Sequence, residues 1–241
     1  MNEERQVRAG PDGVPAITFI EDVRDGLPWA DLVEVIGPAP ADVIFSELRG
    51  WAVSAPPALG EELVRRGARL VRHAHEMACD LRAVPIAAGE PPEGFRFVPC
   101  DRPAEQVFPA WRAAYPPGHP DHHPRDEAKA LHEELAPLLG GRIIGRLLPC
   151  SVLAVDRGDE VVAGVLITDR DGTPWVPEVF RHPARSPRGL GGLLLAGAQA
   201  RAVADGLTTL GLAVTEGNPA RRLYERLGFT VVRTAMTVIV P

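Results

Sequence analysis

RSPRGLGGLLL at residues 185–195 and NPARRLYERLGF at residues 218–229 carry the strongest structural signal in this chain. The first stretch is a glycine-rich loop that leads directly into an apolar helix. The second is a polar turn followed by a helix and a Gly-Phe stop. The start of a helix carries unpaired backbone N–H groups and a partial positive charge, which together attract phosphate groups. Because glycine lets the backbone approach such a ligand, the first stretch is a candidate pyrophosphate-binding loop.

The glycine loop on its own is equally consistent with an ordinary turn or with a site of close helix packing. It is not a nucleotide P-loop, since no Gly-Lys-Ser/Thr follows it. It is also not a GxGxxG dinucleotide motif, because Leu194 occupies the position of the third glycine. The second stretch is therefore needed to interpret the first.

The two stretches, in this order and followed by the strand-like TVVRTAMTVIV at residues 230–240, resemble the GNAT superfamily of acetyl-CoA-dependent N-acetyltransferases. The resemblance implies an α/β (α+β) fold with a mixed, mostly antiparallel central sheet flanked by helices. Periodicity and turn signals fit that order of elements. The strands are expected at residues 95–98, 152–155, 161–168, 175–181, 207–214 and 229–240, and the helices at residues 104–114, 126–139, 190–205 and 220–227.

A proline-rich break at Val84–Glu93 divides the chain into expected domains at residues 1–92 and 93–241, with a loose terminus at residues 1–14. Residues 49–78 also align without a gap on residues 210–239, with identical residues at eight positions. Such an internal repeat predicts that the first domain is a degenerate, structural GNAT half-domain. The alternative is chance, because both segments are rich in Ala, Val, Arg and Gly. His73 and His75 would face one exposed side of a strand there.

Composition limits the partners and the compartment. A net charge of −6 argues against a broad basic surface for nucleic acid and weakly favours a cationic acceptor. We find no signal-like apolar N-terminus and no run that could span a membrane. Cys79, Cys100 and Cys150 are scattered and odd in number, which predicts reduced thiols in the cytoplasm.

The resemblance implies where acetyl-CoA lies. The strand before the glycine loop, WVPEVFR, would hold the pantetheine and the thioester against backbone groups of Val179, Phe180 and Arg181, at a gap between two strands. The pyrophosphate would lie on the loop formed by Arg188, Gly189, Leu190, Gly191 and Gly192. This chain departs from the family pattern, because Ser186 replaces an Arg or Gln and Pro187 has no N–H. Arg185 or Arg188 could supply a charged contact instead.

Three residues are candidates near the reacting atoms, each with a second interpretation. In the family, a tyrosine at the position of Tyr224 protonates the departing thiolate; the alternative is an aromatic ring packed on the sheet. Glu178 is the candidate general base, or else a solvated strand carboxylate. The resemblance implies that Asn218 contacts the pantetheine, and the sequence also suits Asn218 as a helix N-cap before Pro219.

The loop YPPGHPDHHP at residues 115–124 has two interpretations. The family often covers its acceptor with this connection, which makes Trp111, Tyr115 and His119 candidate acceptor contacts. The alternative is a proline-stiffened surface loop. The loop also contains Asp121, His122 and His123, but these residues lack the spacing of zinc ligands, and we predict no metal.

The resemblance therefore implies an enzyme that moves an acetyl group from acetyl-CoA to a primary amine of a small molecule, by direct attack in a ternary complex. No histidine partner is identified for Cys150, which argues against a cysteine nucleophile. Neither nucleic acid nor a membrane is an expected partner, and a homodimer is left open. The alternative functions are a non-catalytic acyl-CoA-binding regulator on the same fold and a scaffold that pairs through the N-terminal repeat.

Overall fold

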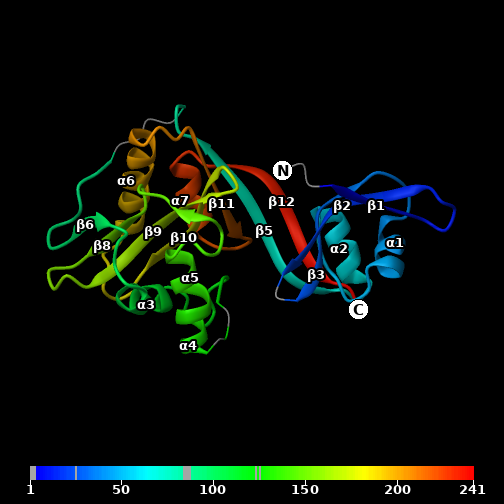
Figure 1. Cartoon of the computed structure of the whole chain (residues 1–241), viewed down its shortest axis with the longest axis horizontal. Helices are drawn as coiled ribbons and strands as arrows, with labels where there is room; N and C mark the ends of the chain where they lie inside the picture. Colours follow the sequence, from blue (N-terminus) through cyan, green and yellow to red (C-terminus); the bar gives the residue numbers. More distant parts are fainter. Residues whose placement is uncertain (1–3, 25, 84–87, 123, 125) are drawn as a thin grey trace. The chain divides into compact units, whose positions relative to one another are not determined.

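The computed structural model describes residues 4–24, 26–83, 88–122, 124 and 126–241 (Figure 1). The chain forms two compact units. Unit 1 consists of Met1–His75 and Arg233–Pro241, and unit 2 consists of Glu76–Val232. The long strands β5 (Arg69–Asp80) and β12 (Thr230–Ile239) therefore contribute residues to both units. The division of the chain into an N-terminal half-domain and a catalytic domain at residue 92 stays a prediction.

Unit 1 is a sheet with the strand order β1-β2-β3-β4-β12, in which only β3 and β4 pair in parallel. Phe19, Ile44 and Leu63 are fully buried in its core, where the apolar sides of α1 and α2 pack. Its elements are β1 (Arg5–Ala9), β2 (Pro15–Arg24), β3 (Leu27–Val35), α1 (Pro40–Glu47), β4 (Ala52–Ala55) and α2 (Pro57–Arg65).

Two sequence expectations for unit 1 were wrong. Residues 5–9 form strand β1 rather than a loose terminus, because β1 pairs with β2 and the Arg5 guanidinium donates to the Leu32 carbonyl at 2.7 Å. His75 does not lie on an exposed face. Its side chain is buried, and its Nδ1 lies 2.8 Å from the Thr234 hydroxyl.

The sheet of unit 2 has the order β11-β10-β9-β8-β6, and β5 lies beside β11. Only β10 and β11 pair in parallel among these five strands, so the sheet is mixed and mostly antiparallel, as predicted. A short strand, β7, pairs with β9. The strands are β6 (Arg96–Pro99), β7 (Arg146–Leu147), β8 (Val152–Val155), β9 (Val161–Arg170), β10 (Thr173–Arg181) and β11 (Thr209–Thr215).

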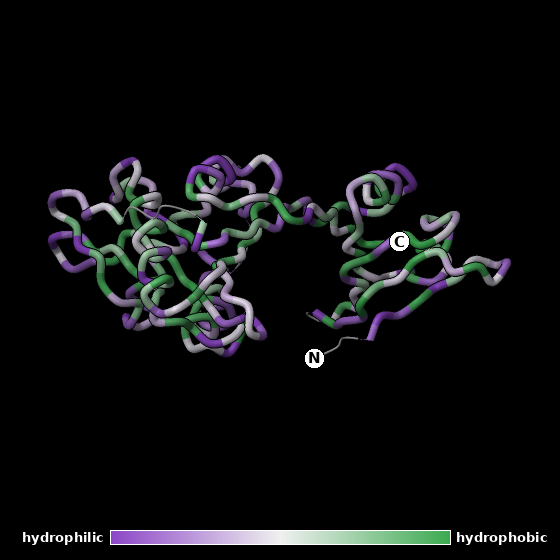
Figure 2. Tube along the Cα trace, turned by 90° about the horizontal axis from the view of Figure 1, so that it is seen from above, coloured by the Kyte–Doolittle hydropathy of each residue, from purple (hydrophilic) through white to green (hydrophobic). Residues whose placement is uncertain are grey.

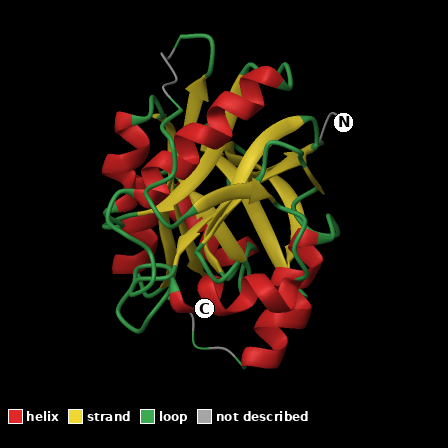
Figure 3. Ribbon diagram, turned by 90° about the vertical axis from the view of Figure 1, so that its left-hand side faces the viewer, coloured by secondary structure: helices red, strands yellow, loops and turns green. Residues whose placement is uncertain are grey.

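Helices cover both faces of this sheet (Figures 1 and 3). The side chains of β8 alternate between the faces: Val152 and Ala154 join the core beneath α6 (Leu190–Ala204), whereas Leu153 and Val155 join the core beneath α3 (Ala104–Ala113). Apolar residues concentrate along the strands, and the connecting turns are mainly hydrophilic (Figure 2). Apart from the short strand β7, which was not predicted, the strand and helix order of residues 95–240 agrees with the sequence prediction.

The helix predicted at residues 126–139 is present but is not a regular α-helix. It runs as α4 (Glu127–Lys129), a π-helical segment η1 (Ala130–Leu135) and α5 (Ala136–Leu139). Asp126 caps its start by accepting the Lys129 N–H at 3.0 Å. Pro137 lacks the N–H that a regular helix needs at that position, which explains why the hydrogen-bond pattern changes there.

The segment that the sequence aligned with the C-terminus has the same order of elements. Strand β4, helix α2 and strand β5 in the first segment correspond to β11, α7 (Ala220–Arg226) and β12 in the second. This order is what a duplicated half-fold would have, and duplication remains a prediction.

Candidate functional site

The glycine loop between β10 and α6 is a tight turn built on its own backbone. Gly189 has a φ of 88°, a conformation that costs glycine little, and it begins α6. The Leu190 N–H donates to the Pro187 carbonyl at 3.3 Å, and the Gly192 N–H donates to the Gly189 carbonyl at 3.0 Å. The positions that Cβ atoms would occupy at Gly189 and Gly191 are open. A ligand can therefore reach this backbone closely.

Three N–H groups of the loop remain available. In the described part of the chain, the backbone N–H groups of Arg188, Gly189 and Gly191 have no hydrogen-bond acceptor. They lie at the N-terminus of the fifteen-residue helix α6, where the helix dipole adds positive potential. This arrangement can hold an anion such as a pyrophosphate.

The departures from the family pattern have a local explanation. The Ser186 hydroxyl donates to the His182 carbonyl at 2.6 Å and is buried, so it braces the loop from inside. Arg185 donates to Asp156 at 2.7 Å. Arg188 is exposed, and no partner for its side chain is recorded among the described residues. Of the two arginines that were candidates for a charged contact with the pyrophosphate, Arg185 is thus already paired and Arg188 is available.

The strand before the loop separates from its neighbour. Strand β10 pairs with β11 only at Trp175 and Val176, whereas its pairing with β9 continues to Arg181. A bulge after Trp175 shifts the register with β9, and it contains Pro177, which has no N–H to donate. Residues 178–181 thus keep one neighbouring strand and lose the other. The predicted pantetheine contacts Val179, Phe180 and Arg181 all belong to this separated part.

Tyr115 and Glu178 are in direct contact. The Tyr115 hydroxyl, which follows α3, donates to Glu178 Oε2 on β10. Burial raises the pKa of Tyr115 well above its usual value, and the charge of Glu178 raises it further. The buried Trp111 ring and the His119 ring both pack edge-on against Tyr115, with centroids 6.2 and 5.3 Å away. The three predicted acceptor contacts therefore form one cluster, and Tyr115 links that cluster to the candidate base.

Tyr224 on α7 lies near the same carboxylates. It is 8% exposed, and its ring centroid is 6.1 Å from that of Phe229. Burial raises the pKa of Tyr224, and the charges of Asp121 and Glu178 raise it further. The same two carboxylates also act on Tyr115. In the described part of the chain, the Tyr224 hydroxyl has no hydrogen-bond partner.

Asp121 was not a predicted site residue, yet it joins the 115–122 loop to the end of β11. Its Oδ1 accepts the Thr215 hydroxyl at 2.5 Å, and its Oδ2 accepts the Asn218 amide at 2.7 Å. Thr215 and Asn218 lie 94 and 97 residues away in sequence. Local spacing carries no information about such a contact, and the sequence showed only an acidic residue among histidines.

Asn218 uses both ends of its amide within the chain. The nitrogen donates to Asp121, and Oδ1 accepts the Ala220 N–H at 2.8 Å, at the start of α7. This is the local capping arrangement that its position before Pro219 suggested. Its contact with pantetheine remains a prediction.

Among the described residues, no group of three or more His, Cys, Asp or Glu side chains could hold a metal ion. In the histidine-rich loop, His119 Nδ1 accepts the Asp121 N–H at 3.1 Å, and His122 Nδ1 lies 2.8 Å from the Tyr115 carbonyl. These ring nitrogens serve the shape of the loop. His123 lies outside the described residues.

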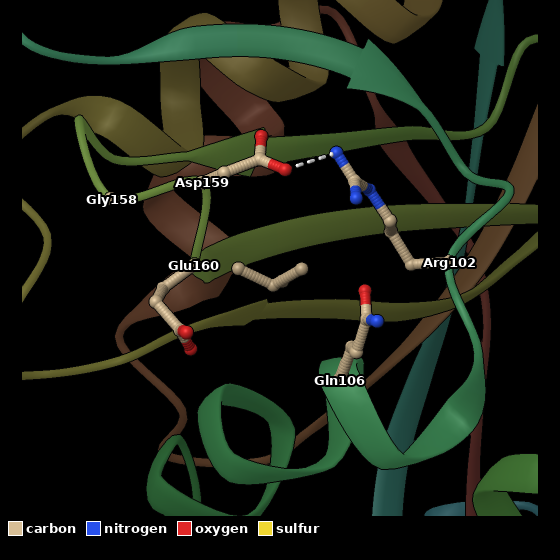
Figure 4. A pocket seen from close by; sticks show the side chains of 6 residues that line it. Arg102, Gln106, Gly158, Asp159 and Glu160 are labelled. Atoms are coloured by element: carbon tan, nitrogen blue, oxygen red, sulfur yellow. Dashed lines mark hydrogen bonds and ion pairs between the residues drawn. The ribbon is translucent and has the colours of Figure 1, made fainter.

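A small polar pocket lies away from these residues (Figure 4). Asp159 accepts hydrogen bonds from Arg102 at 2.8 Å and from Arg96 at 2.7 Å, so its charge is neutralised locally. None of the predicted site residues lines it. Its lining consists of Arg102, Gln106, Gly158, Asp159, Glu160 and Val161.

Residues 104–229, which include the glycine loop, the separated strand and Tyr224, match the model of the Acetyltransferase (GNAT) family. The chain belongs to the GNAT family. The match indicates that this GNAT protein is an acyltransferase. Members of the family generally use acyl-CoA. No curated protein sequence matches it significantly. In its described residues, no helix is both long and apolar enough to cross a membrane.

Solved structures show the same fold. A GCN5-related N-acetyltransferase from Sphaerobacter thermophilus is 21% identical, with a TM-score of 0.58, and the alignment covers 99% of this chain and 82% of that one. A GCN5-related N-acetyltransferase from Kribbella flavida is also 21% identical, with a TM-score of 0.57 and coverages of 99% and 90%. A tandem GNAT protein from the clavulanic acid biosynthesis pathway is 15% identical, with a TM-score of 0.57 and coverages of 96% and 80%.

Proposed function

We propose that this protein transfers an acetyl group from acetyl-CoA to a primary amine of a small molecule, by direct attack in a ternary complex. The observation that carries the proposal is the separation of β10 from β11 directly before a loop with three available N–H groups. The separated strand offers backbone groups to pantetheine, and the loop offers N–H groups to pyrophosphate. The separated strand and the loop together suit the pantetheine and the pyrophosphate of acetyl-CoA.

The side chains suit the proton transfers. The amine nitrogen forms a bond to the acetyl carbon, and the carbon–sulfur bond breaks. Glu178 accepts a proton from the amine, directly or through water, and Tyr224 gives a proton to the departing thiolate. Burial and the nearby carboxylates raise the pKa of Tyr224, so its hydroxyl keeps its proton at neutral pH and is able to donate it. The backbone of Val179, Phe180 and Arg181 is the candidate donor to the thioester oxygen.

The chemistry needs no thiol of the protein. Burial raises the pKa of Cys150 to about 11 and that of Cys100 to about 12, so both thiols are protonated at neutral pH. A protonated thiol is a poor nucleophile. This supports direct attack by the amine rather than an acetylated cysteine.

We also propose that unit 1 descends from a duplicated half of the GNAT fold and has a structural role. The repeated order of strand, helix and strand supports it, and a structural neighbour is a tandem GNAT protein. The first copy has Leu63 where the second has Tyr224, and Leu63 is fully buried in an apolar core. A cytoplasmic location fits the free cysteines of the described chain.

The cofactor site is tested by thermal unfolding with acetyl-CoA, CoA and longer acyl-CoAs. A ligand at about 100 times its dissociation constant adds about 2.7 kcal/mol to the free energy of unfolding, which raises the Tm by several degrees. Gly191→Trp fills the open space at the loop and should abolish the increase. Val203→Trp, at an exposed position near the other end of α6, is the matched control and should keep it.

Turnover separates the enzyme from a binder. CoA release that depends on an added amine, measured over a panel of primary amines, supports the transferase. A Tm increase with acetyl-CoA and no amine-dependent CoA release would instead identify a non-catalytic acyl-CoA-binding protein. A folded protein with no Tm response to any acyl-CoA would contradict both.

A further inference from the structure

We propose that Asp121 determines acceptor specificity: it binds a second positive charge on the acceptor, so that the preferred substrates are small diamines. This inference rests on the proposed acetyl transfer and names the class of amine. Asp121 is placed for this role by the way its loop is attached to the sheet.

The loop at residues 115–122 is fastened to both of the strands that separate. On the β10 side, the Tyr115 hydroxyl donates to Glu178. On the β11 side, Asp121 accepts from Thr215 and Asn218. The loop therefore joins β10 to the end of β11, beyond the point where their pairing stops. Asp121 and Glu178 are thus the carboxylates at the two attachments of this loop, where the strands separate and the thioester is expected.

The Asp121 carboxylate is held by neutral hydrogen-bond donors. Thr215 and Asn218 are neutral donors, and in the part of the chain that the structure describes no Lys or Arg side chain pairs with Asp121. His119 Nδ1 lies 3.9 Å from Asp121 Oδ2. The same nitrogen accepts the Asp121 N–H at 3.1 Å. The Asp121 side chain is 29% exposed, so a ligand can reach it.

Tyr224 offers a second polar atom to a ligand. It is more than nine-tenths buried, and its hydroxyl has no hydrogen-bond partner among the described residues. Among the described residues, the buried polar atoms that lack a partner do not include this hydroxyl, so solvent or a ligand can reach it. The charges of Asp121 and Glu178 both raise the pKa of this hydroxyl after burial does.

The chemistry of these groups selects the acceptor. Carboxylate and phenol oxygens accept hydrogen bonds from an ammonium group, and a carboxylate binds it with a charge-assisted bond. An acceptor with its own carboxylate would face like charge at Asp121 and Glu178, which disfavours it. A diamine can present one amine to the thioester and leave the other, still protonated, at Asp121.

The test compares three acceptors of equal chain length that differ in the distal group: 1,4-diaminobutane, 4-amino-1-butanol and 4-aminobutanoate. We expect kcat/KM to be about tenfold or more higher for the diamine than for the amino alcohol, and lowest for the amino acid. Asp121→Asn keeps the size of the side chain and removes its charge. It should reduce the diamine preference about tenfold and change kcat/KM for the amino alcohol less than about threefold.

Two further variants separate charge recognition from loop position. Thr215→Val removes one hydrogen bond to Asp121 and keeps its charge, so kcat/KM should fall equally for the diamine and the amino alcohol. Asp171→Asn removes an exposed charge in the β9–β10 turn, where a φ of 51° suits asparagine, and should change neither value. An equal loss for both acceptors in Asp121→Asn, or no diamine preference in the wild type, would overturn the inference.

Calorimetric titration of 1,4-diaminobutane into the CoA-loaded protein keeps the inference separate from the proposed function. Diamine binding that disappears in Asp121→Asn supports charge recognition by Asp121, even if no amine is acetylated and the proposed transfer fails. Turnover of neutral amines together with no measurable diamine binding would overturn the inference and leave the transferase standing.

Discussion

The side chain of Tyr224 is mostly buried, and its hydroxyl has no hydrogen-bond partner in the described part of the chain; burial raises its pKa, and two carboxylates raise it further. An isolated tyrosine titrates near pH 10. In the folded protein, the proton therefore stays on Tyr224 to a higher pH, where a departing thiolate can take it. The proposed role of Tyr224 as an acid depends on its hydroxyl alone, because the ring is held by packing against Phe229.

Tyr224→Phe should lower kcat for amine acetylation by about 10²- to 10⁴-fold, because it removes the proton donor and keeps the ring. The Tm increase with acetyl-CoA should remain, since the glycine loop is unchanged. Steady-state CoA release and thermal unfolding measure the two effects. A variant with wild-type kcat would show that the thiolate leaves without this proton.

The same residue makes the stability of the protein depend on alkaline pH. The folded-state pKa of Tyr224 lies above its unfolded value, so its contribution is fully present below about pH 10 and is lost as the pH rises through the folded value. Denaturant unfolding of the wild type and of Tyr224→Phe, measured at neutral pH and above pH 10, should show a smaller alkaline loss of stability in the variant.

At the scale of elements, the packing of strand β10 against β9 requires a glycine at position 164. A Cβ at Gly164 would lie 2.4 Å from the ring of Phe180 and 2.9 Å from the side chain of Leu153. Phe180 is fully buried and belongs to the separated part of β10. The glycine therefore allows β10 to lie flat on its neighbour at the position where pantetheine is expected.

Gly164→Ala should lower the free energy of unfolding by about 1–3 kcal/mol, because the buried aromatic ring has to move. Gly197→Ala is the matched control. Gly197 lies inside α6, and a Cβ there would be 3.9 Å from the nearest atom of Phe97, which is an ordinary contact. In a helix, alanine is more favourable than glycine by about 0.5–1 kcal/mol. Urea unfolding of both variants should therefore give changes of opposite sign, and equal changes would contradict this account of the packing.

Most elements of unit 2 could be predicted because they rest on local patterns. Short apolar runs on either side of the turn DRGDE placed β8 and β9, and the glycine signals placed the ends of α6 and α7. The π-helical segment and the Asp121 contacts could not be predicted in this way. Asp121 forms hydrogen bonds with residues that are distant in the sequence. Neither periodicity nor spacing predicts which loop contacts which strand. For the same reason the sequence put His75 on an exposed face, although it pairs with Thr234.

At the scale of the whole molecule, unit 1 is not one continuous piece of chain. Val238 in the last strand and Val240 just after it are fully buried in the core of unit 1. Strand β12 pairs with β4 from Met236 to Ile239. A fragment that stops before residue 233 leaves one edge of β4 unpaired, and the core of unit 1 loses the side chains of Val238 and Val240.

A fragment of residues 1–92, the first domain that the sequence predicts, should therefore not fold by itself. Its circular dichroism should lack stable secondary structure and a cooperative thermal transition. A peptide of residues 233–241 added to it should restore part of the structure, since it supplies the missing strand. A peptide with Val238→Asp is the control. A fragment that unfolds cooperatively without any peptide would contradict this description of unit 1.

The order in which the chain is made adds a consequence to the position of β12. The first seventy-five residues leave the ribosome early, but the strand that completes their core follows only after the whole of unit 2 has been synthesised. During that interval, the nascent N-terminal segment exposes an open sheet edge and apolar side chains, the features that invite chaperones or aggregation. The part of the protein that is translated first is thus the last to be finished.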